Sequence, residues 1–252
     1  MSKETRFYFD TAVDIFKKIE SQCDGSINEA AELIYQAIIK DEIVHIIGTG
    51  GHSNMAAMEV FWRAGGLAPI NAILDPGIAL VHGAKHSNII ERTPGYAKSV
   101  LDSYGVKKGE VLIIVNAYGI NTMTIDTALE AKKRGLRTIG ISSTSFADNV
   151  PKDHPARHPS GKNLYEIVGI FVDSYLPLGD AIVKFNNFEQ KIAPTSTLCN
   201  SFTLNLIVIK TVEKILEKGG IPPVWMSANM PGGDEANKKW EKKYYSRVKH
   251  LR

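Results

Sequence analysis

The sequence of 252 residues predicts a three-layer α/β/α sandwich with a parallel, doubly wound sheet, preceded by an N-terminal helical hairpin. Two observations predict this fold class. Several short runs are continuously apolar and rich in β-branched residues, which is typical of parallel strands that are covered on both faces. Most of these runs lead through a turn of glycines or small polar residues into a segment with helical periodicity.

Residues 1–40 predict the helical hairpin. Their apolar residues repeat at helical spacing in two separate stripes. The stripes are Phe9, Val13, Phe16 and Ile19, and then Ile27, Ala31, Ile34 and Ile38. We expect the hairpin to pack on the sheet or on a partner subunit.

Strands are predicted at residues 43–47, 111–115, 138–141 and 167–172, within a sheet of about five strands. Helices are predicted over residues 54–64, 121–134 and about 195–218. Glycines directly follow each of these helices, where they commonly end a helix. Residues 75–93 fit neither period, and a connection of this length is either a functional loop or a surface excursion.

The charge pattern separates the C-terminus from the rest of the chain. We expect a single domain over residues 1–252, with the hairpin at 1–40, the α/β core at 41–220 and a basic tail at 221–252. The net charge is +3, and residues 234–252 hold seven Lys or Arg against three Asp or Glu. Such a tail fits an anionic partner, a neighbouring subunit or simply a solvated helix face. No nucleic-acid-binding motif accompanies it, so we expect no nucleic-acid partner.

Composition also bears on location. No apolar run approaches the roughly 18–20 residues that cross a bilayer, so we expect no membrane association. The first residues carry charge and lead into no apolar segment, which makes a secretory signal unexpected. The only cysteines, Cys23 and Cys199, cannot form a zinc cage by themselves, so we expect no metal site. Sparse cysteine fits a reduced, cytoplasmic location.

Small polar residues gather where predicted strands end or a helix begins. Ligands of open parallel sheets bind beyond the carboxyl ends of the strands, and helix N-terminal amides favour anionic or strongly polar groups. We therefore expect these residues to bind a polyhydroxylated ligand. They are Gly48, Gly50, Gly51, His52, Ser53 and Asn54; Asn116, Tyr118, Gly119, Asn121 and Thr122; Ser142, Ser143 and Thr144; and Thr195 and Ser196.

The sequence comes close to two nucleotide-binding motifs but matches neither. The turn Gly48-x-Gly50-x-x-Ser53 has serine in place of the third glycine of the dinucleotide fingerprint. Asp75 also lies later than the acidic residue of that motif, which is expected about 20 residues on. Gly161-Lys162 is followed by Asn163, whereas a P-loop needs serine or threonine there. A dinucleotide-dependent oxidoreductase thus rests only on an imperfect glycine turn.

The order and spacing of these features across residues 43–220 resemble the sugar isomerase (SIS) domain. More narrowly, residues 61–67, 73–76, 160–162 and 224–235, with Glu91-Arg92 and Gly95-Tyr96, resemble the bacterial SIS-domain group labelled UPF0309. The resemblance implies a phosphosugar-binding protein, dimeric or larger, without a redox cofactor. It also implies aldose–ketose isomerisation of a sugar phosphate or a related reaction. The alternative is a sensor that binds a sugar phosphate without turnover.

One turn departs from the family pattern. SIS phosphosugar proteins carry a Ser-x-Ser-Gly-x-Thr turn that wraps the phosphate, and here the turn is Asn116-Ala117-Tyr118-Gly119-Ile120-Asn121. Both serines and the threonine are replaced. An unphosphorylated or unusual sugar derivative is therefore a second possibility for the ligand.

Isomerisation needs a base near C1 and C2 of the sugar and a group that opens the ring. The resemblance places a glutamate on the helix after the first strand, which makes Glu59 the candidate base. His82, with His86 as an alternative, is the candidate for ring opening because histidine titrates near neutrality. Glu59 can equally be an ordinary exposed side chain, and a lone histidine on a loop is more often simply exposed. His52, in the glycine turn, is expected to bind substrate rather than to catalyse.

Overall fold

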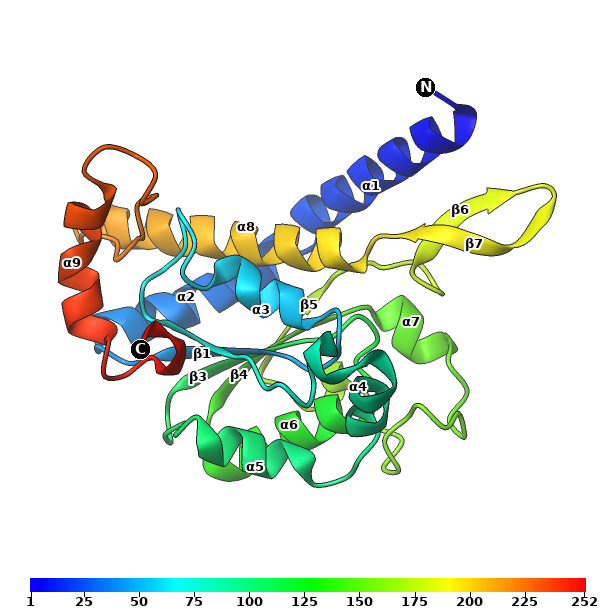
Figure 1. Cartoon of the computed structure of the whole chain (residues 1–252), viewed down its shortest axis with the longest axis horizontal. Coiled ribbons are helices and arrows are strands. Elements are labelled where there is room, and N and C mark those ends of the chain that lie inside the picture. The colour runs from blue at the N-terminus through cyan, green and yellow to red at the C-terminus, as the bar shows by residue number, and fades with distance from the viewer.

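Five parallel strands form the central sheet of the computed structural model, which describes residues 1–252 (Figure 1). Their order across the sheet is β2-β1-β3-β4-β5. The strands are β1 Val44–Gly48, β2 Ile70–Ile73, β3 Val111–Val115, β4 Arg137–Ser142 and β5 Ile170–Asp173. The predicted fold class is confirmed, with Val44 paired in parallel to both Ile70 and Val111.

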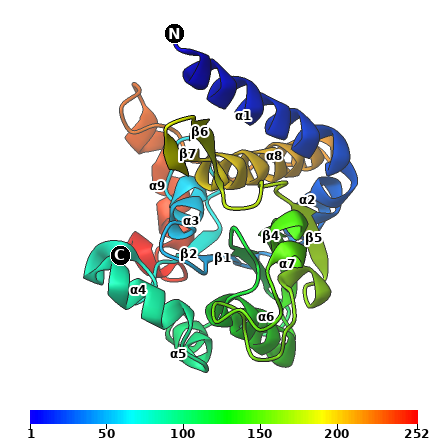
Figure 2. The ribbon, with the colours of Figure 1, turned by 90° about the vertical axis from the view of Figure 1, so that its right-hand side faces the viewer.

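Helices cover both faces of this sheet (Figure 2). The alternation of side chains along each strand divides the core in two. Ile46 and Ile113 pack with α2, α3 and α8 on one face, whereas Ile47 and Leu112 pack with α5 and α6 on the other. These helices are α2 Asp24–Ile39, α3 Asn54–Val60, α5 Tyr96–Ser103, α6 Thr122–Arg134 and α8 Ser196–Glu217. Dry faces on both sides explain why the strands are continuously apolar.

The N-terminal hairpin consists of α1 Lys3–Gln22 and α2. Helix α2 lies on the sheet beside α8, whereas the first half of α1 points away from the body of the molecule (Figures 1 and 2). The apolar side chains of Phe7 and Phe9, in that half, are exposed. No helix combines the length and the apolar character that a membrane span requires.

Helix α3 is shorter than the prediction of residues 54–64. It ends at Val60 because Phe61 is extended and Trp62 adopts a left-handed backbone with φ of 47°. By contrast, α6 ends as predicted at Gly135, whose φ is 71°. Glycine adopts this conformation freely and tryptophan only rarely, so the end of α3 has no local sequence signal.

Residues 75–93 contain two short helices, η1 Leu80–His82 and α4 Ala84–Glu91. After β4 come α7 Thr144–Asn149 and η2 Leu164–Glu166. An antiparallel hairpin of β6 Ala181–Phe185 and β7 Phe188–Pro194, which we call the arm, projects beside α1 (Figure 1). The sequence did not predict the arm, because most of its side chains are exposed and form no apolar run.

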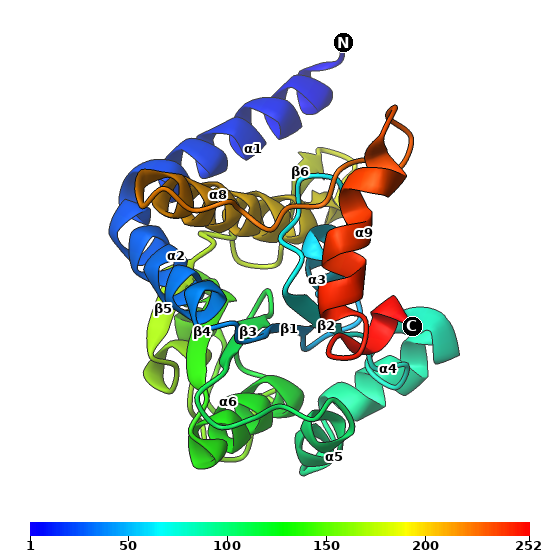
Figure 3. The ribbon, with the colours of Figure 1, turned by 90° about the vertical axis from the view of Figure 1, so that its left-hand side faces the viewer.

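Residues 221–252 fold back along the β2 edge of the sheet (Figure 3). They include α9 Gly233–Tyr244 and η3 Lys249–Leu251. Tyr244 and Val248 are buried with Trp225 against Ile43 and Ala68. The lysines of α9 remain exposed, so the basic charge lies on a solvated helix face.

Candidate functional site

A cleft of about 510 Å³ opens at the carboxyl ends of β1 and β3. Five parts of the chain line it: the turn after β1, the turn after β3, the segment of η1 and α4, the loop after α7, and the base of the arm with the start of α8. The lining residues are Gly50, Gly51, His52, Ser53, Leu80, Ala84, Ser87, Asn88, Glu91, Arg92, Asn116, Ala117, Tyr118, Ile120, Asn121, Ala156, Asp180, Pro194, Ser196 and Thr197. Ten of these twenty residues carry a hydroxyl, carboxamide or carboxylate, which suits a polyhydroxylated ligand.

Glu91, the last residue of α4, lies among these polar groups. The Gly51 amide donates to its Oε1 at 2.8 Å, and Asn121 Nδ2 donates to its Oε2 at 3.2 Å. Burial raises the pKa of Glu91, because desolvation disfavours the charged carboxylate more than these two donors favour it. A carboxylate whose pKa is moved upward in a cleft is suited to proton transfer.

Side chains of the turn after β3 form hydrogen bonds with the backbone amides of the same turn. Asn116 Oδ1 accepts from the amides of Tyr118 at 3.0 Å and Gly119 at 2.9 Å, and its Nδ2 donates to the Thr49 carbonyl at 3.3 Å. Asn121 caps α6 by accepting from the Thr124 amide at 2.8 Å. The amides that would face a phosphate at this turn therefore already have side-chain acceptors.

Asp180, at the base of the arm, accepts hydrogen bonds from backbone amides at the start of α8, as Asn121 does at the start of α6. Its Oδ1 accepts from the amides of Thr195 at 2.9 Å and Ser196 at 2.8 Å, and its Oδ2 accepts from Ser196 Oγ at 2.7 Å. Carboxylates stabilise helix N-termini in this way. Two carboxylates thus lie in the cleft, and Arg92 is the only Lys or Arg that lines it.

Tyr118 forms an aromatic wall of the cleft. Its ring stacks on Phe146 with a centroid separation of 3.7 Å and an interplanar angle of 20°. Burial raises the pKa of Tyr118, and the charges of Asp180 and Glu91 add to the shift, so its hydroxyl stays protonated.

Half of the predicted binding residues line the cleft: Gly50, Gly51, His52, Ser53, Asn116, Tyr118, Asn121 and Ser196. The others lie outside the lining: Gly48, Asn54, Gly119, Thr122, Ser142, Ser143, Thr144 and Thr195. Gly48 allows the backbone of Ser53 to approach closely, since a Cβ at Gly48 would lie 2.0 Å from the Ser53 carbonyl oxygen. Ser143 caps α7 and donates to the Leu176 carbonyl.

The two predicted catalytic residues are not brought together. Glu59 lies on α3 outside the lining and pairs with Arg63 at 3.1 Å. His82 is exposed on η1, with its ring centroid 6.2 Å from that of His86, and neither histidine lines the cleft.

Sequence reasoning did not assign Glu91, Arg92 or Asp180 to the site. A signal existed for α4, since Ala84, Ser87, Asn88 and Glu91 recur at the spacing of one helix face and all line the cleft. Asp180 follows Gly179 in a loop with no periodic pattern, so only the folded chain shows its contacts.

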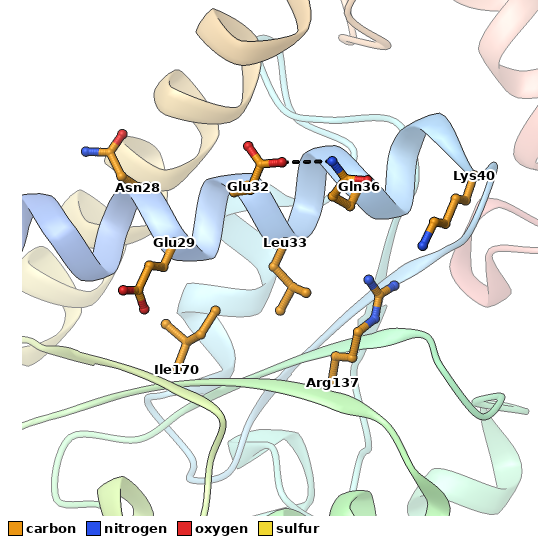
Figure 4. A pocket seen from close by; sticks show the side chains of 8 residues that line it. All are labelled: Asn28, Glu29, Glu32, Leu33, Gln36, Lys40, Arg137 and Ile170. Atoms are coloured by element: carbon orange, nitrogen blue, oxygen red, sulfur yellow. Dashed lines mark hydrogen bonds between the residues drawn. The ribbon is translucent and has the colours of Figure 1, made fainter.

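A second hollow of about 520 Å³ lies between α2 and the starts of β4 and β5 (Figure 4). Its side chains are Asn28, Glu29, Glu32, Leu33, Gln36, Lys40, Arg137 and Ile170. Arg137 is already bonded to Glu42 and to the Gly109 carbonyl. This hollow is at the opposite end of the strands from the cleft and contains no predicted site residue. No group of three or more His, Cys, Asp or Glu side chains is arranged to hold a metal ion.

Comparison with known proteins agrees with this architecture. A family model of the SIS domain matches residues 7–143. A UPF0309 protein of Caldanaerobacter subterraneus is 38% identical over 247 residues, covering 97% of this chain and 98% of the relative. One of Geobacillus thermodenitrificans is 35% identical over 241 residues, covering 96% and 95%.

Two solved structures share the fold at 14% identity. A phosphoheptose isomerase from Francisella tularensis has a TM-score of 0.53 and covers 84% of this chain and 100% of its own. One from Neisseria gonorrhoeae has a TM-score of 0.51 and covers 84% and 97%. With the family model and the full-length relatives, the conclusion is that the chain belongs to the SIS domain family and, within it, to the UPF0309 proteins.

Proposed function

We propose that this protein binds a sugar phosphate in the cleft and interconverts its aldose and ketose forms through an enediol. The observation that carries the proposal is Glu91, a partly buried carboxylate with a raised pKa among hydroxyl and amide groups. SIS membership and the likeness to two proteins named phosphoheptose isomerases support the same reaction class.

The cleft suits a monosaccharide in size and chemistry. Its volume of about 510 Å³ is within the range of small-molecule sites. The hydroxyls of Ser53 and Thr197 and the amide of Asn88 would bind sugar hydroxyls. Arg92 would hold the phosphate, because it is the only Lys or Arg in the lining.

Glu91 would act as the base. Its carboxylate takes the proton from C2 of the open-chain aldose while the C1 carbonyl becomes the enediol hydroxyl. The same carboxylate then returns the proton to C1, and the ketose carbonyl forms at C2. The Gly51 amide and Asn121 Nδ2 fix the carboxylate between these steps. A pKa raised toward the working pH favours both directions of transfer.

His52 would move the proton between O1 and O2, because it lines the cleft and its charge acts on Glu91. The sequence predicts Glu59 and His82 for catalysis and His52 for substrate binding. Glu59 and His82 lie outside the lining of a single chain, so the geometry favours Glu91 and His52.

A panel of sugar phosphates and unphosphorylated sugars tests the proposal in two stages. Thermal shifts identify ligands that bind the folded state, and turnover of those ligands is then followed directly. Glu91→Gln keeps the shape and removes the base, with Glu59→Gln as the matched control. We expect Glu91→Gln to lower kcat by about 10²–10⁴ and Glu59→Gln to leave it within a few-fold. Binding without turnover by the wild type would instead indicate a non-catalytic sensor.

We further propose that the protein is a cytoplasmic homo-oligomer of at least two copies. Phe7 and Phe9 on α1 and Phe188 and Ile192 on the arm are exposed. Helix α1 packs against strand β6 of the arm. Exposed apolar groups gathered in this way mark association surfaces. Cys23 and Cys199 are free and buried, which fits a reducing compartment.

A further inference from the structure

Two of the segments that resemble the narrower family meet just beyond the C-terminal end of α3. Residues 61–67 and 224–229 are joined by a short antiparallel bridge between Leu67 and Val224. The Gly65 amide donates to the Trp225 carbonyl at 2.9 Å, and the Trp225 amide donates to the Gly66 carbonyl at 3.0 Å. This bonding holds the two segments as one rigid wall.

A pocket of about 420 Å³ lies between them. It is lined by Trp62, Arg63, Ala64, Trp225, Met226, Ser227, Ala228, Asn229 and Asn237, none of which lines the cleft. The buried amide of Asn237 fixes one rim by accepting from the Met226 amide at 2.9 Å and donating to its carbonyl at 2.8 Å. Gly233 fixes the same rim, because a Cβ there would lie 2.1 Å from the Ser227 carbonyl oxygen.

Trp62 is the unusual residue of this pocket. Its φ of 47° is a conformation that bulky residues rarely adopt, and strain of this kind gathers at ligand clamps. The strained backbone places its ring 4.5 Å from that of buried Trp225, at an interplanar angle of 62°. Even so, Trp62 remains 49% exposed, so packing within the chain does not use the whole ring.

The polar groups beside this ring are a cation and a carboxamide. Arg63 is bonded through Nε to Glu59, and its side chain is 59% exposed, so its guanidinium is accessible to a ligand. Asn229 adds a neutral amide at the rim. An open aromatic face, a guanidinium and an amide together match a hydroxylated ring that carries an anionic group.

We propose that Trp62, Arg63, Trp225 and Asn229 form a second binding site, separate from the cleft, for a sugar that bears a phosphate or carboxylate. The C–H face of the sugar lies on the Trp62 indole. Its anionic group bonds to Arg63, and its hydroxyls bond to Asn229. This site is independent of whether the cleft catalyses isomerisation.

Calorimetry and tryptophan fluorescence of the full chain test the site with four probes: glucose 6-phosphate, glucuronate, glucose and inorganic phosphate. The titrations are made in the Gly50→Val variant, in which the valine side chain is expected to fill the cleft. We expect saturable quenching by glucose 6-phosphate or glucuronate, and the better of the two identifies the anionic group. Trp62→Gly should abolish binding of that probe in calorimetry, and circular dichroism should show the fold retained, because glycine adopts a positive φ freely. Arg63→Gln should lower the affinity for the anionic probe about tenfold or more and leave the affinity for glucose unchanged.

Trp240→Phe, which removes the third tryptophan outside the pocket, is the control and should keep the wild-type affinity. The proposal is overturned if no probe binds, or if Trp62→Gly and Arg63→Gln bind like the parent. It is also overturned if Trp62→Gly changes the oligomeric state, because the pocket would then be an interface between copies.

Discussion

Glu91 accepts a hydrogen bond from the Gly51 amide at 2.8 Å, which joins the end of α4 to the glycine turn after β1. The contact gives residues 75–93 a role at the site, since α4 forms one wall of the cleft. It also fills the glycine turn with a carboxylate. The turn therefore presents a proton acceptor to the ligand where a free amide would otherwise lie.

The raised pKa of Glu91 predicts a specific effect on stability. A carboxylate whose pKa is raised on folding binds more protons in the folded state, so the protein loses stability as the pH rises through that pKa. Above that pKa the carboxylate is charged, and this stability is lost. Glu91→Gln should therefore raise the Tm at pH 7 while lowering turnover, and the gain should shrink toward pH 4. Thermal melts across pH 4–8 measure this. A Tm that falls equally at every pH would show that Glu91 is only a structural tie.

Gly50→Val tests the position of the ligand. A Cβ at Gly50 would lie 3.2 Å from Asn116 Nδ2 and 3.3 Å from Glu91 Oε1, so the methyl groups of valine would enter the cleft. We expect binding in the thermal-shift panel to be lost, with circular dichroism unchanged. Gly25→Ala is the control, because a Cβ at Gly25 meets nothing within 4 Å. Normal ligand binding by Gly50→Val would place the site elsewhere.

Asp180→Asn tests whether the charged carboxylate of Asp180 stabilises the start of α8. Asparagine tolerates the positive φ of 63° at this position and keeps one acceptor oxygen, but the charge at the start of α8 is removed. We expect the free energy of unfolding in urea to fall by about 0.5–1 kcal/mol. Asp153→Asn, at an exposed position outside any helix, should change it far less. Equal losses in the two variants would contradict the capping role.

The exposed aromatic residues of the arm and α1 predict how copies associate. Phe188→Ser combined with Phe7→Ser should shift the protein toward monomer in light scattering at micromolar concentration, because apolar burial drives such interfaces. Lys184→Ser, at an exposed position of the same arm, should leave the assembly intact. If the wild type is already a monomer, or if the double variant keeps its mass, these residues do not form the interface.

The sheet could be predicted from the sequence because its strands are buried on both faces and so have a strong, local pattern. Strand β2 was missed because it has only four residues, one of them the polar Asn71, and directly follows Pro69. The end of α3 was misplaced because Trp62 adopts a conformation for which its residue type carries no signal.

The candidate site was predictable only in part. The turns after β1 and β3 were recognised because glycines and small polar residues at strand ends are a local feature. The contact of Glu91 with Gly51 spans 40 residues, and that of Asp180 with Ser196 spans 16 residues across the arm. Such contacts depend on how α4 and the arm fold back, which no local pattern encodes.

Solvent exchange during turnover tests the central claim most directly. In deuterium oxide, an enediol path exposes the transferred proton to solvent, so the product of the wild-type enzyme should carry deuterium at C1 or C2 by nuclear magnetic resonance. Glu91→Gln should lose this incorporation, whereas Glu59→Gln should keep it. Deuterium incorporation that survives in Glu91→Gln would remove Glu91 from the mechanism, and tight sugar-phosphate binding by the wild type without any exchange would contradict isomerisation itself.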